Sequence, residues 1–351
     1  MEEGTFFEPS KESLEQFLKR WLNHVERQGL KETTLDTYKA YVQAYLNPAL
    51  GHIPLAQLTS LAIQDAFDAM VDRGLGSLTI RNARRILKRA LAKAVKWKKL
   101  KDNPAADVET PKAKRTKRRA WMEEEAAAFL AAARENPDDL IFIFVLCTGL
   151  RPVEFLGLQW LDLELVREYD ARREQSVARG LVHVRRDLIR PRGKDWKLSD
   201  PKTENGIREI YFPAALYHEL MEHKARQDEQ RRMMGSTYHD HQFVFAYPNG
   251  EPLERGWLTA SRFKPLLKRA KLSDEFSLYS LRRSFATLTT AGGASRIGRS
   301  TQMGHADPDF TDDVYVTILP SMQKSVSDAL ENLLFSDTRT LSAHNQAERL
   351  M

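Results

Sequence analysis

Apolar residues in the first third of the chain recur every three or four positions, which is the spacing of one buried face of an α-helix. Ser10 is the expected cap of the first helix, Pro48 follows the second and Gly74 ends the third. Four segments carry this pattern: residues 10–29, 33–48, 61–74 and 77–99. The pattern predicts a helical bundle as the first domain.

Beyond residue 120 the pattern is mixed. Helical spacing favours helices over residues 122–134, 137–147, 152–160, 256–270, 281–291, 295–303 and 322–335. Alternating apolar and polar residues predict strands within 180–189 and 206–212, and a strand that enters a turn over 242–253. The charge-rich stretch 164–180 is assigned to a helix and is interpreted as an insertion. The expected fold class is therefore mainly α, of the α+β type, with a small antiparallel sheet.

Residues 107–120 interrupt both patterns. They contain prolines, have no apolar period and place six Lys or Arg residues between positions 112 and 119. Such a segment is typical of a flexible linker. We therefore expect a helical first domain over 10–106, a basic linker over 107–120, a second domain over 121–335 and a tail over 336–351.

Positive charge is concentrated around this linker. The chain has a net charge of only +6, but residues 81–119 hold 16 basic and 3 acidic residues. This distribution favours a polyanion such as DNA, although a solvated helix face with a basic linker would have the same composition. The candidate phosphate contacts are Arg81, Arg84, Arg85 and Lys88 on one helix face, and Lys112, Lys114, Arg115, Lys117, Arg118 and Arg119 in the linker.

Several other classes of protein fit the sequence poorly. The single cysteine, Cys147, excludes an internal disulfide framework, and no apolar run approaches the roughly 20 residues that span a bilayer. The acidic N-terminus does not resemble a signal peptide, so we expect a cytoplasmic protein without a membrane partner. His239, Asp240 and His241, with His218 and His223 upstream, are spaced irregularly. We interpret them as part of a polar loop, and we expect no metal and no cofactor.

Four separated motifs carry candidate chemistry: "TGLRPVEFLGLQW", "PKTENGIREI", "YSLRRSFAT" and "MGHADPDFTDDVYV". Each has an ordinary reading by itself, such as an ion pair between Arg151 and Glu154, a solvated Lys202 or a core tyrosine at 315. The candidate residues are Arg151, Glu154, Lys202, Tyr279, Arg282, Arg283, His305 and Tyr315.

Taken together and in this order, the motifs resemble the tyrosine recombinase family, the phage integrases. The resemblance spans about residues 10–335 and includes a helical, SAM-like N-terminal domain. It implies a site-specific recombinase, used for example in viral genome integration, that cuts and rejoins DNA through a 3′-phosphotyrosine at Tyr315. Because the phosphotyrosine conserves the energy of the broken bond, the family's reaction needs neither ATP nor a metal.

The resemblance also implies residue roles that suit the chemistry. Arg151 and Arg282 would bind the non-bridging phosphate oxygens, because guanidinium groups offer paired donors and stay charged. Lys202 would protonate the leaving 5′ oxygen. His305 would donate to a phosphate oxygen or assist proton removal from Tyr315. Glu154 would orient Arg151.

Tyr279 departs from the family pattern, which more often has histidine at that place, so we expect a positioning role for it. Arg283 is either a DNA contact or a structural ion-pair partner. Only about ten residues precede the first helix, which is too few for the arm-binding domain of many phage integrases. The expected partners are attachment sites in double-stranded DNA, three further protomers in a tetramer on DNA, and accessory DNA-bending proteins. Free in a bacterial host cell, the protein would be a monomer.

Two alternatives remain. A type IB topoisomerase uses similar residues to nick and reseal DNA, but the helical first domain and the amphipathic segment 322–335 favour a recombinase. A DNA-binding protein without catalysis would have no need of all five of Arg151, Lys202, Arg282, His305 and Tyr315.

Overall fold

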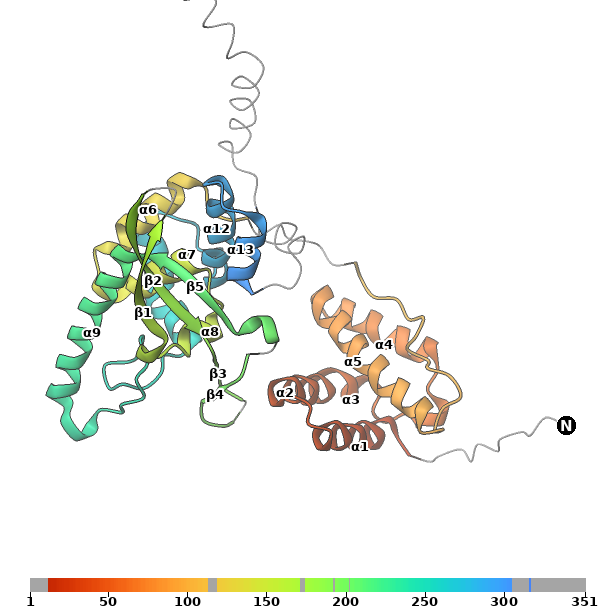
Figure 1. Cartoon of the computed structure of the whole chain (residues 1–351). Coiled ribbons are helices and arrows are strands. Elements are labelled where there is room, and N and C mark those ends of the chain that lie inside the picture. Colours follow the sequence, from red (N-terminus) through yellow and green to blue (C-terminus); the bar gives the residue numbers. More distant parts are fainter. Residues whose placement is uncertain are drawn as a thin grey trace, which may run out of the picture. The chain divides into compact units, whose positions relative to one another are not determined.

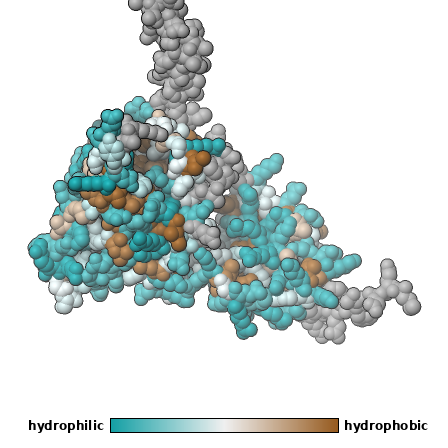
Figure 2. Space-filling model, in the orientation of Figure 1, coloured by the Kyte–Doolittle hydropathy of each residue, from teal (hydrophilic) through white to brown (hydrophobic). Residues whose placement is uncertain are grey.

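The computed structural model describes residues 12–112, 119–170, 174–191, 193–201, 203–304 and 316. The chain forms two compact units, Met1–Thr116 with Arg190–Asp195, and Lys117–Ile189 with Trp196–Met351 (Figure 1). Each unit has a hydrophobic core of its own. On the face that Figure 2 presents, hydrophilic residues cover most of both units. Within the described residues no helix combines the length and the apolar character needed to cross a membrane.

The first unit is a bundle of helices. These are α1 (Leu14–Arg27), α2 (Glu32–Tyr41), α3 (Asn47–Leu50), α4 (Ser60–Asp72) and α5 (Ser77–Lys96), with a π-helical turn (Val42–Leu46) that joins α2 to α3. The expectation that Ser10 caps the first helix is wrong. Ser13 is the cap: its Oγ accepts from Gln16 N at 3.3 Å, and Gln16 Oε1 accepts from Ser13 N at 3.1 Å. This reciprocal pair is a capping box, which satisfies two backbone donors at the start of α1.

Helix α5 contributes a full stripe to the core of this unit. Its buried residues are Ile80, Ala83, Ile86, Leu87, Ala90, Leu91 and Ala94, all at three- or four-residue spacing. In the same core the Trp21 ring stacks on Tyr38 with centroids 5.4 Å apart. The opposite side of α5, which carries Arg81 and Arg85, remains exposed.

The second unit contains most of the remaining helices. They are α6 (Glu123–Arg134), α7 (Leu140–Thr148), α8 (Pro152–Leu156), α9 (Ala214–Met234), α10 (Arg255–Trp257), α11 (Lys264–Arg269), α12 (Leu278–Ala291) and α13 (Arg296–Met303). A π-helical stretch (Leu258–Phe263) connects α10 to α11, so the helix predicted over 256–270 is continuous but not uniformly α-helical. The helix predicted over 152–160 ends early because β3 passes close by. A Cβ at Gly157 would lie 2.8 Å from the Leu188 nitrogen.

A three-stranded antiparallel sheet of order β1-β2-β5 packs on these helices, with strands β1 (Leu163–Asp170), β2 (Gln175–Val184) and β5 (Arg208–Pro213) (Figure 1). A second, two-stranded sheet pairs β3 (Asp187–Ile189) with β4 (Lys197–Ser199). The helix expected over 164–180 is therefore wrong, because this stretch forms the β1–β2 hairpin with Asp170 opposite Gln175. The strand expected from residue 242 is also wrong. That region makes only isolated bridges, Gln159 with Phe243 and Ala246 with Pro252.

Helix α7 lies at the centre of the second unit. All of its residues except Cys147 are buried, and it packs against α6, α9, α12 and β5. A helix that is apolar on every side is stable only when neighbours surround it. It ends at Gly149, whose φ of +66° is accessible to glycine at low cost. A Cβ at Gly149 would approach Phe285 of α12 to 2.5 Å, so the turn also needs glycine for space.

Candidate active site

Arg151 stands directly after the glycine turn that ends α7. It is the N-cap of α8, and Pro152 occupies the first helical position, where its missing N–H costs nothing. Glu154, one turn later, accepts from the Arg151 backbone N–H at 2.7 Å through Oε2 and from Arg151 Nη1 at 2.7 Å through Oε1. The carboxylate therefore fixes both the backbone and the guanidinium of Arg151.

Arg208 is a third charged member of this cluster, and the sequence analysis did not identify it. Its Nη1 and Nη2 donate to Glu154 Oε1 and Oε2 at 2.9 and 3.0 Å, a bidentate pair. Strand β5 alternates buried and exposed residues, and Arg208 is on the buried side with Ile210 and Phe212. An arginine at an inward position of a strand needs a buried anion, and this requirement is the signal that could have revealed the pair.

The surroundings of Glu154 stabilise its charged form. Burial by itself raises the pKa of Glu154, but the hydrogen bond from Arg208 and the positive charges of Arg208, Arg151 and Arg282 lower it to about 2. Glu154 is consequently an anion at every physiological pH and is unsuited to proton transfer. Its function in this geometry is to hold guanidinium groups.

Arg282 extends from the first turns of α12 into the same region and is completely buried. Its Nη1 donates to the Gly149 carbonyl and its Nη2 to the Met303 carbonyl. Arg151 Nη2 donates at 3.1 Å to the carbonyl of the next residue, Gly304. Arginines separated by 131 positions of sequence thus donate to two consecutive carbonyls at the end of α13, and α12 and α13 lie side by side (Figure 1).

Gly304 permits this convergence. Its φ is +64°, and a Cβ there would lie 2.8 Å from the Asn205 carbonyl oxygen and 3.1 Å from the Arg208 guanidinium carbon. Arg208 Nε also donates to the Gln302 carbonyl, so the end of α13 is bound to β5 as well as to Arg151 and Arg282. The "GH" pair of the sequence therefore begins with a glycine that the packing requires.

Of the remaining candidate catalytic residues, the structure describes only some. Lys202, His305 and Tyr315 lie outside the described residues. Val316, which follows Tyr315 in sequence, packs against the cluster of Phe285, Ala286 and Met303. Tyr279 and Arg283 also lie on α12, three residues before and directly after Arg282. The Tyr279 side chain is exposed, and Arg283 is half-buried.

The candidate DNA-contacting residues fall into three groups. Arg81, Arg85 and Lys112 are exposed. Arg84 Nη2 and Lys88 Nζ donate to the Ala106 carbonyl at 2.7 and 3.1 Å, and Arg119 forms a bidentate pair with Glu125. Lys114, Arg115, Lys117 and Arg118 lie outside the described residues. Arg84, Lys88 and Arg119 thus have structural contacts that the sequence did not indicate.

Known proteins resemble this chain in sequence. Residues 13–71 match the family described as phage integrase, N-terminal SAM-like domain. The chain is 26% identical over 326 residues to a XerC-like tyrosine recombinase of Caldanaerobacter subterraneus, with 89% of this chain and 81% of that protein covered. The chain belongs to the tyrosine recombinase family. The ICEBs1 integrase of Bacillus subtilis is also 26% identical to this recombinase over 285 residues, which cover 80% of this chain and 72% of the relative.

Solved structures share the fold of this recombinase. The integrase of transposon Tn1549, in complex with transposon right-end DNA, superposes with a TM-score of 0.71 at 20% identity, over 92% of this chain and 99% of that one. A lambda integrase tetramer bound to a Holliday junction gives 0.59 at 18% identity, over 87% and 78% of the two chains. The predicted family and the predicted mainly helical fold class are both confirmed.

Proposed function

We propose that this recombinase cuts and rejoins DNA at specific attachment sites through a covalent 3′-phosphotyrosine intermediate at Tyr315. One observation carries the proposal. Arg282 donates to the carbonyl of Met303 and Arg151 to the carbonyl of Gly304, the two residues that directly precede His305 in the sequence. Two of the proposed catalytic residues, Arg151 and Arg282, therefore meet at the end of α13, directly before His305 in the sequence.

The arginines supply the electrostatic part of the reaction. In the transition state the phosphate gains negative charge on its non-bridging oxygens, and donors fixed in advance stabilise that charge. Glu154 and Arg208 hold Arg151 in place without reacting. Arg282 is completely buried, so a phosphate reaches it only after the groups that cover it have moved.

The covalent steps follow from the remaining residues. The Tyr315 phenol oxygen attacks phosphorus, its proton passes to a base or to solvent, and the bond from phosphorus to the 5′ oxygen breaks. Lys202 gives its proton to that leaving 5′ oxygen. In the second step a 5′ hydroxyl attacks the phosphotyrosine, and the phenol leaves and regains a proton. His305 donates to a phosphate oxygen, and Tyr279 positions the phosphate from the first turn of α12.

The packing of Val316 supports the proposed role of Tyr315 as the nucleophile. Val316 contacts Phe285 and Met303, which lie three residues beyond Arg282 and two residues before His305. A nucleophile at position 315 is therefore adjacent in sequence to a residue packed on α12, which carries Arg282, and on the last residue of α13, whose carbonyl accepts from Arg282. Tyrosine suits this role because its phosphate ester preserves the bond energy needed for rejoining.

The assembly is proposed on the same basis. Residues 10–106 would bind DNA together with the domain over 121–335, joined by the basic linker 107–120 and followed by a tail over 336–351. Four protomers would bring two sites together, as in the lambda integrase tetramer bound to a Holliday junction. DNA-bending proteins would assist in the cytoplasm of a bacterial host.

The test is trapping of the covalent intermediate. The full chain is incubated with a nicked attachment site taken from the DNA that flanks its gene, and the products are separated on a denaturing gel. Wild-type protein is expected to give a protein–DNA adduct, and Tyr315→Phe none, because phenylalanine has no oxygen nucleophile. Tyr169→Phe is the matched control, since Tyr169 lies on β1 with 70% of its surface exposed. The assignment would be rejected if Tyr315→Phe gave an adduct. It would also be rejected if the wild type and Tyr169→Phe both gave no adduct.

A further inference from the structure

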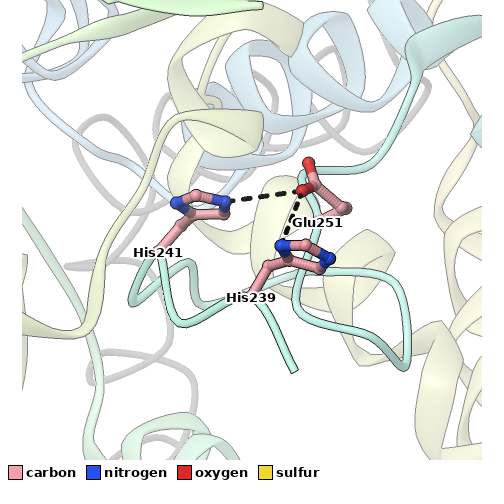
Figure 3. Close-up of side chains that lie close together, drawn as sticks. All are labelled: His239, His241 and Glu251. Carbon is pink, nitrogen blue, oxygen red and sulfur yellow. Dashed lines mark ion pairs between the residues drawn. The ribbon is translucent and has the colours of Figure 1, made fainter. Parts of the chain in front are cut away.

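A second group of reactive side chains lies in the loop between α9 and α10. His239 Nδ1 and His241 Nε2 are each 3.5 Å from Glu251 Oε1, and the two rings are nearly parallel, at an interplanar angle of 11° (Figure 3). No two of the three ligand atoms are more than 4.8 Å apart. Neither the arginine cluster nor the proposed reaction uses these residues.

The backbone brings the three side chains together. The His241 N–H donates to the His239 carbonyl at 3.0 Å, which closes a tight turn around Asp240, and both imidazole rings face Glu251 (Figure 3). Asp240 between them points away and pairs with Arg231 at 2.7 Å. In the sequence the histidines flank Asp240, whereas the carboxylate that faces them in the structure is that of Glu251, after the next turn (Figure 3).

Close backbone packing fixes this turn. The His239 N–H donates to the Asn249 carbonyl at 2.8 Å, and the Tyr247 N–H donates to the Glu251 carbonyl at 2.8 Å. Gly250 has a φ of +84°, and a Cβ there would come within 2.1 Å of the His239 carbonyl oxygen. The site is therefore built by the fold rather than by a chance approach of long side chains.

We propose that His239, His241 and Glu251 bind a divalent transition-metal ion of the zinc class. Imidazole nitrogen and carboxylate oxygen are ligands of such ions, at about 2.0–2.2 Å. In a tetrahedral site this places the ligand atoms about 3.3 Å from one another, close to the two separations of 3.5 Å. Binding requires the two histidine nitrogens to approach each other, and the exposed His239 can make that movement.

Groups around the ligands would orient them. Trp196 Nε1 donates to Glu251 Oε2 at 3.0 Å, which leaves Oε1 directed at the histidines. The His241 ring meets the Trp196 ring edge to face, at 4.8 Å and 78°, and the His241 carbonyl accepts from Gln159 Nε2 at 2.8 Å. Hydrogen bonds of this outer kind fix the orientation of ligands in metal sites.

The site would keep one coordination position for water. Three protein ligands and a water complete a tetrahedral shell. The ion would cross-link the two ends of the 239–251 loop, and Glu251 is also hydrogen-bonded to Trp196, the residue that directly precedes β4. It would therefore stabilise the second unit, whether or not the protein acts as a recombinase.

The test uses tag-free, full-length protein titrated with Co²⁺ and followed by the visible absorption of four-coordinate cobalt. The expected result is binding of about one equivalent, displacement by Zn²⁺, and a higher melting temperature with Zn²⁺, because ligands of the native state stabilise it. His241→Ala and Glu251→Gln should each weaken binding by more than about 100-fold, beyond the range typical of outer-sphere changes. Trp196→Phe keeps the ring contact but removes the donor, and should weaken binding by about 10-fold or more.

His183→Ala is the matched control. His183 also lies between two carboxylates, but Glu164 is at its Nε2, 2.7 Å away, and Glu209 at its Nδ1, 3.2 Å away. Ligands on opposite edges of one ring cannot share an ion with it, so this variant should bind Co²⁺ like the wild type. Absence of binding at millimolar metal, or equal binding by the wild type, His241→Ala and Glu251→Gln, would overturn the proposal. Neither outcome depends on strand exchange, so a failure here leaves the proposed function standing.

Discussion

Glu154 is the residue on which the arginine cluster depends. It accepts hydrogen bonds from the side chains of both Arg151 and Arg208, and it is 3% exposed. Removal of one member of a buried charge cluster leaves the others without compensation, at a typical cost of about 3–5 kcal/mol. Glu154 is therefore a positioning residue whose loss affects both stability and the arginine that it orients.

This dependence predicts a specific pH response. The pKa of Glu154 is lowered from 4.5 to about 2, so its contribution is complete above the ordinary pKa and disappears as the pH falls from about 5 towards 2. The shift corresponds to about 3 kcal/mol of the free energy of unfolding. Glu154→Gln should be less stable than the wild type at neutral pH by about 3–5 kcal/mol, and the difference should shrink through that acidic range.

Denaturant unfolding of both proteins at a series of pH values measures this difference. Glu168→Gln on exposed β1 is the control and should follow the wild type at every pH. A gap between Glu154→Gln and the wild type that stays constant from neutral pH to pH 2 would contradict the assignment.

At the scale of elements, α5 combines a buried stripe with a basic outer face. Arg81 and Arg85 are exposed on it, whereas Arg84 and Lys88 bind the Ala106 carbonyl and so attach the following segment to the helix. The four basic residues that looked equivalent in the sequence therefore have different structural roles.

Double substitution separates these roles. Arg81→Ala with Arg85→Ala should lower the slope of log affinity against log salt by about 0.9 for each lost phosphate contact, about 1.8 in all, without a change in melting temperature. Arg84→Ala with Lys88→Ala should also lower the melting temperature, because the hydrogen bonds to Ala106 are lost. DNA-binding titrations at several salt concentrations test the proposal, and an unchanged slope in the first variant would reject contacts by Arg81 and Arg85.

The elements were predicted well where one face is buried and poorly where neither is. The stripe of α5 and the alternation of β5 continue along each element, so their period was visible in the sequence. The outer ends of β1 and β2 are exposed on both faces, and charged residues there obscured the strand period. Helix α9 gave no clear signal, because only Leu216 and Leu220 of its 21 residues are buried.

The residues of the candidate site that could be predicted are those that lie in the family motifs. Arg151, Glu154 and Arg282 were identified in the sequence, and the structure connects them through Gly149, Met303 and Gly304. The partnership of Arg208 with Glu154 joins residues 54 positions apart, and a single sequence does not reveal such pairing. The same holds for Glu251, which approaches the two histidines only through the turn at Gly250.

At the scale of the whole molecule, two separate cores indicate two units that fold around different sets of residues. The first core includes α1 to α4, which the match to the phage integrase SAM-like domain covers over residues 13–71, and α5, which lies beyond that match. The second unit contains the arginine cluster. In the proposed function both units bind DNA, and the phosphodiester bond is broken in the second unit.

The proposed assembly predicts a change of mass on DNA. The free protein should be a monomer. Four protomers should assemble on two attachment sites in one complex. We propose that the amphipathic segment 322–335 docks on a neighbouring protomer. Removal of this segment should therefore impair pairing of the two sites and leave cleavage of a single site intact. Mass photometry with and without DNA measures both states. Normal recombination by the shortened protein would contradict the docking role.

The exposed hairpin has a further consequence. In the sheet formed by the described residues, β1 pairs only with β2, so no strand of that sheet pairs with the backbone groups of its other edge. Such an edge invites other chains to add strands, which leads to aggregation, and charged side chains oppose this addition. Glu164, Arg167 and Glu168 are exposed along β1. The charged side chains that obscured the strand period of β1 in the sequence are thus the groups that oppose the addition of strands from other molecules.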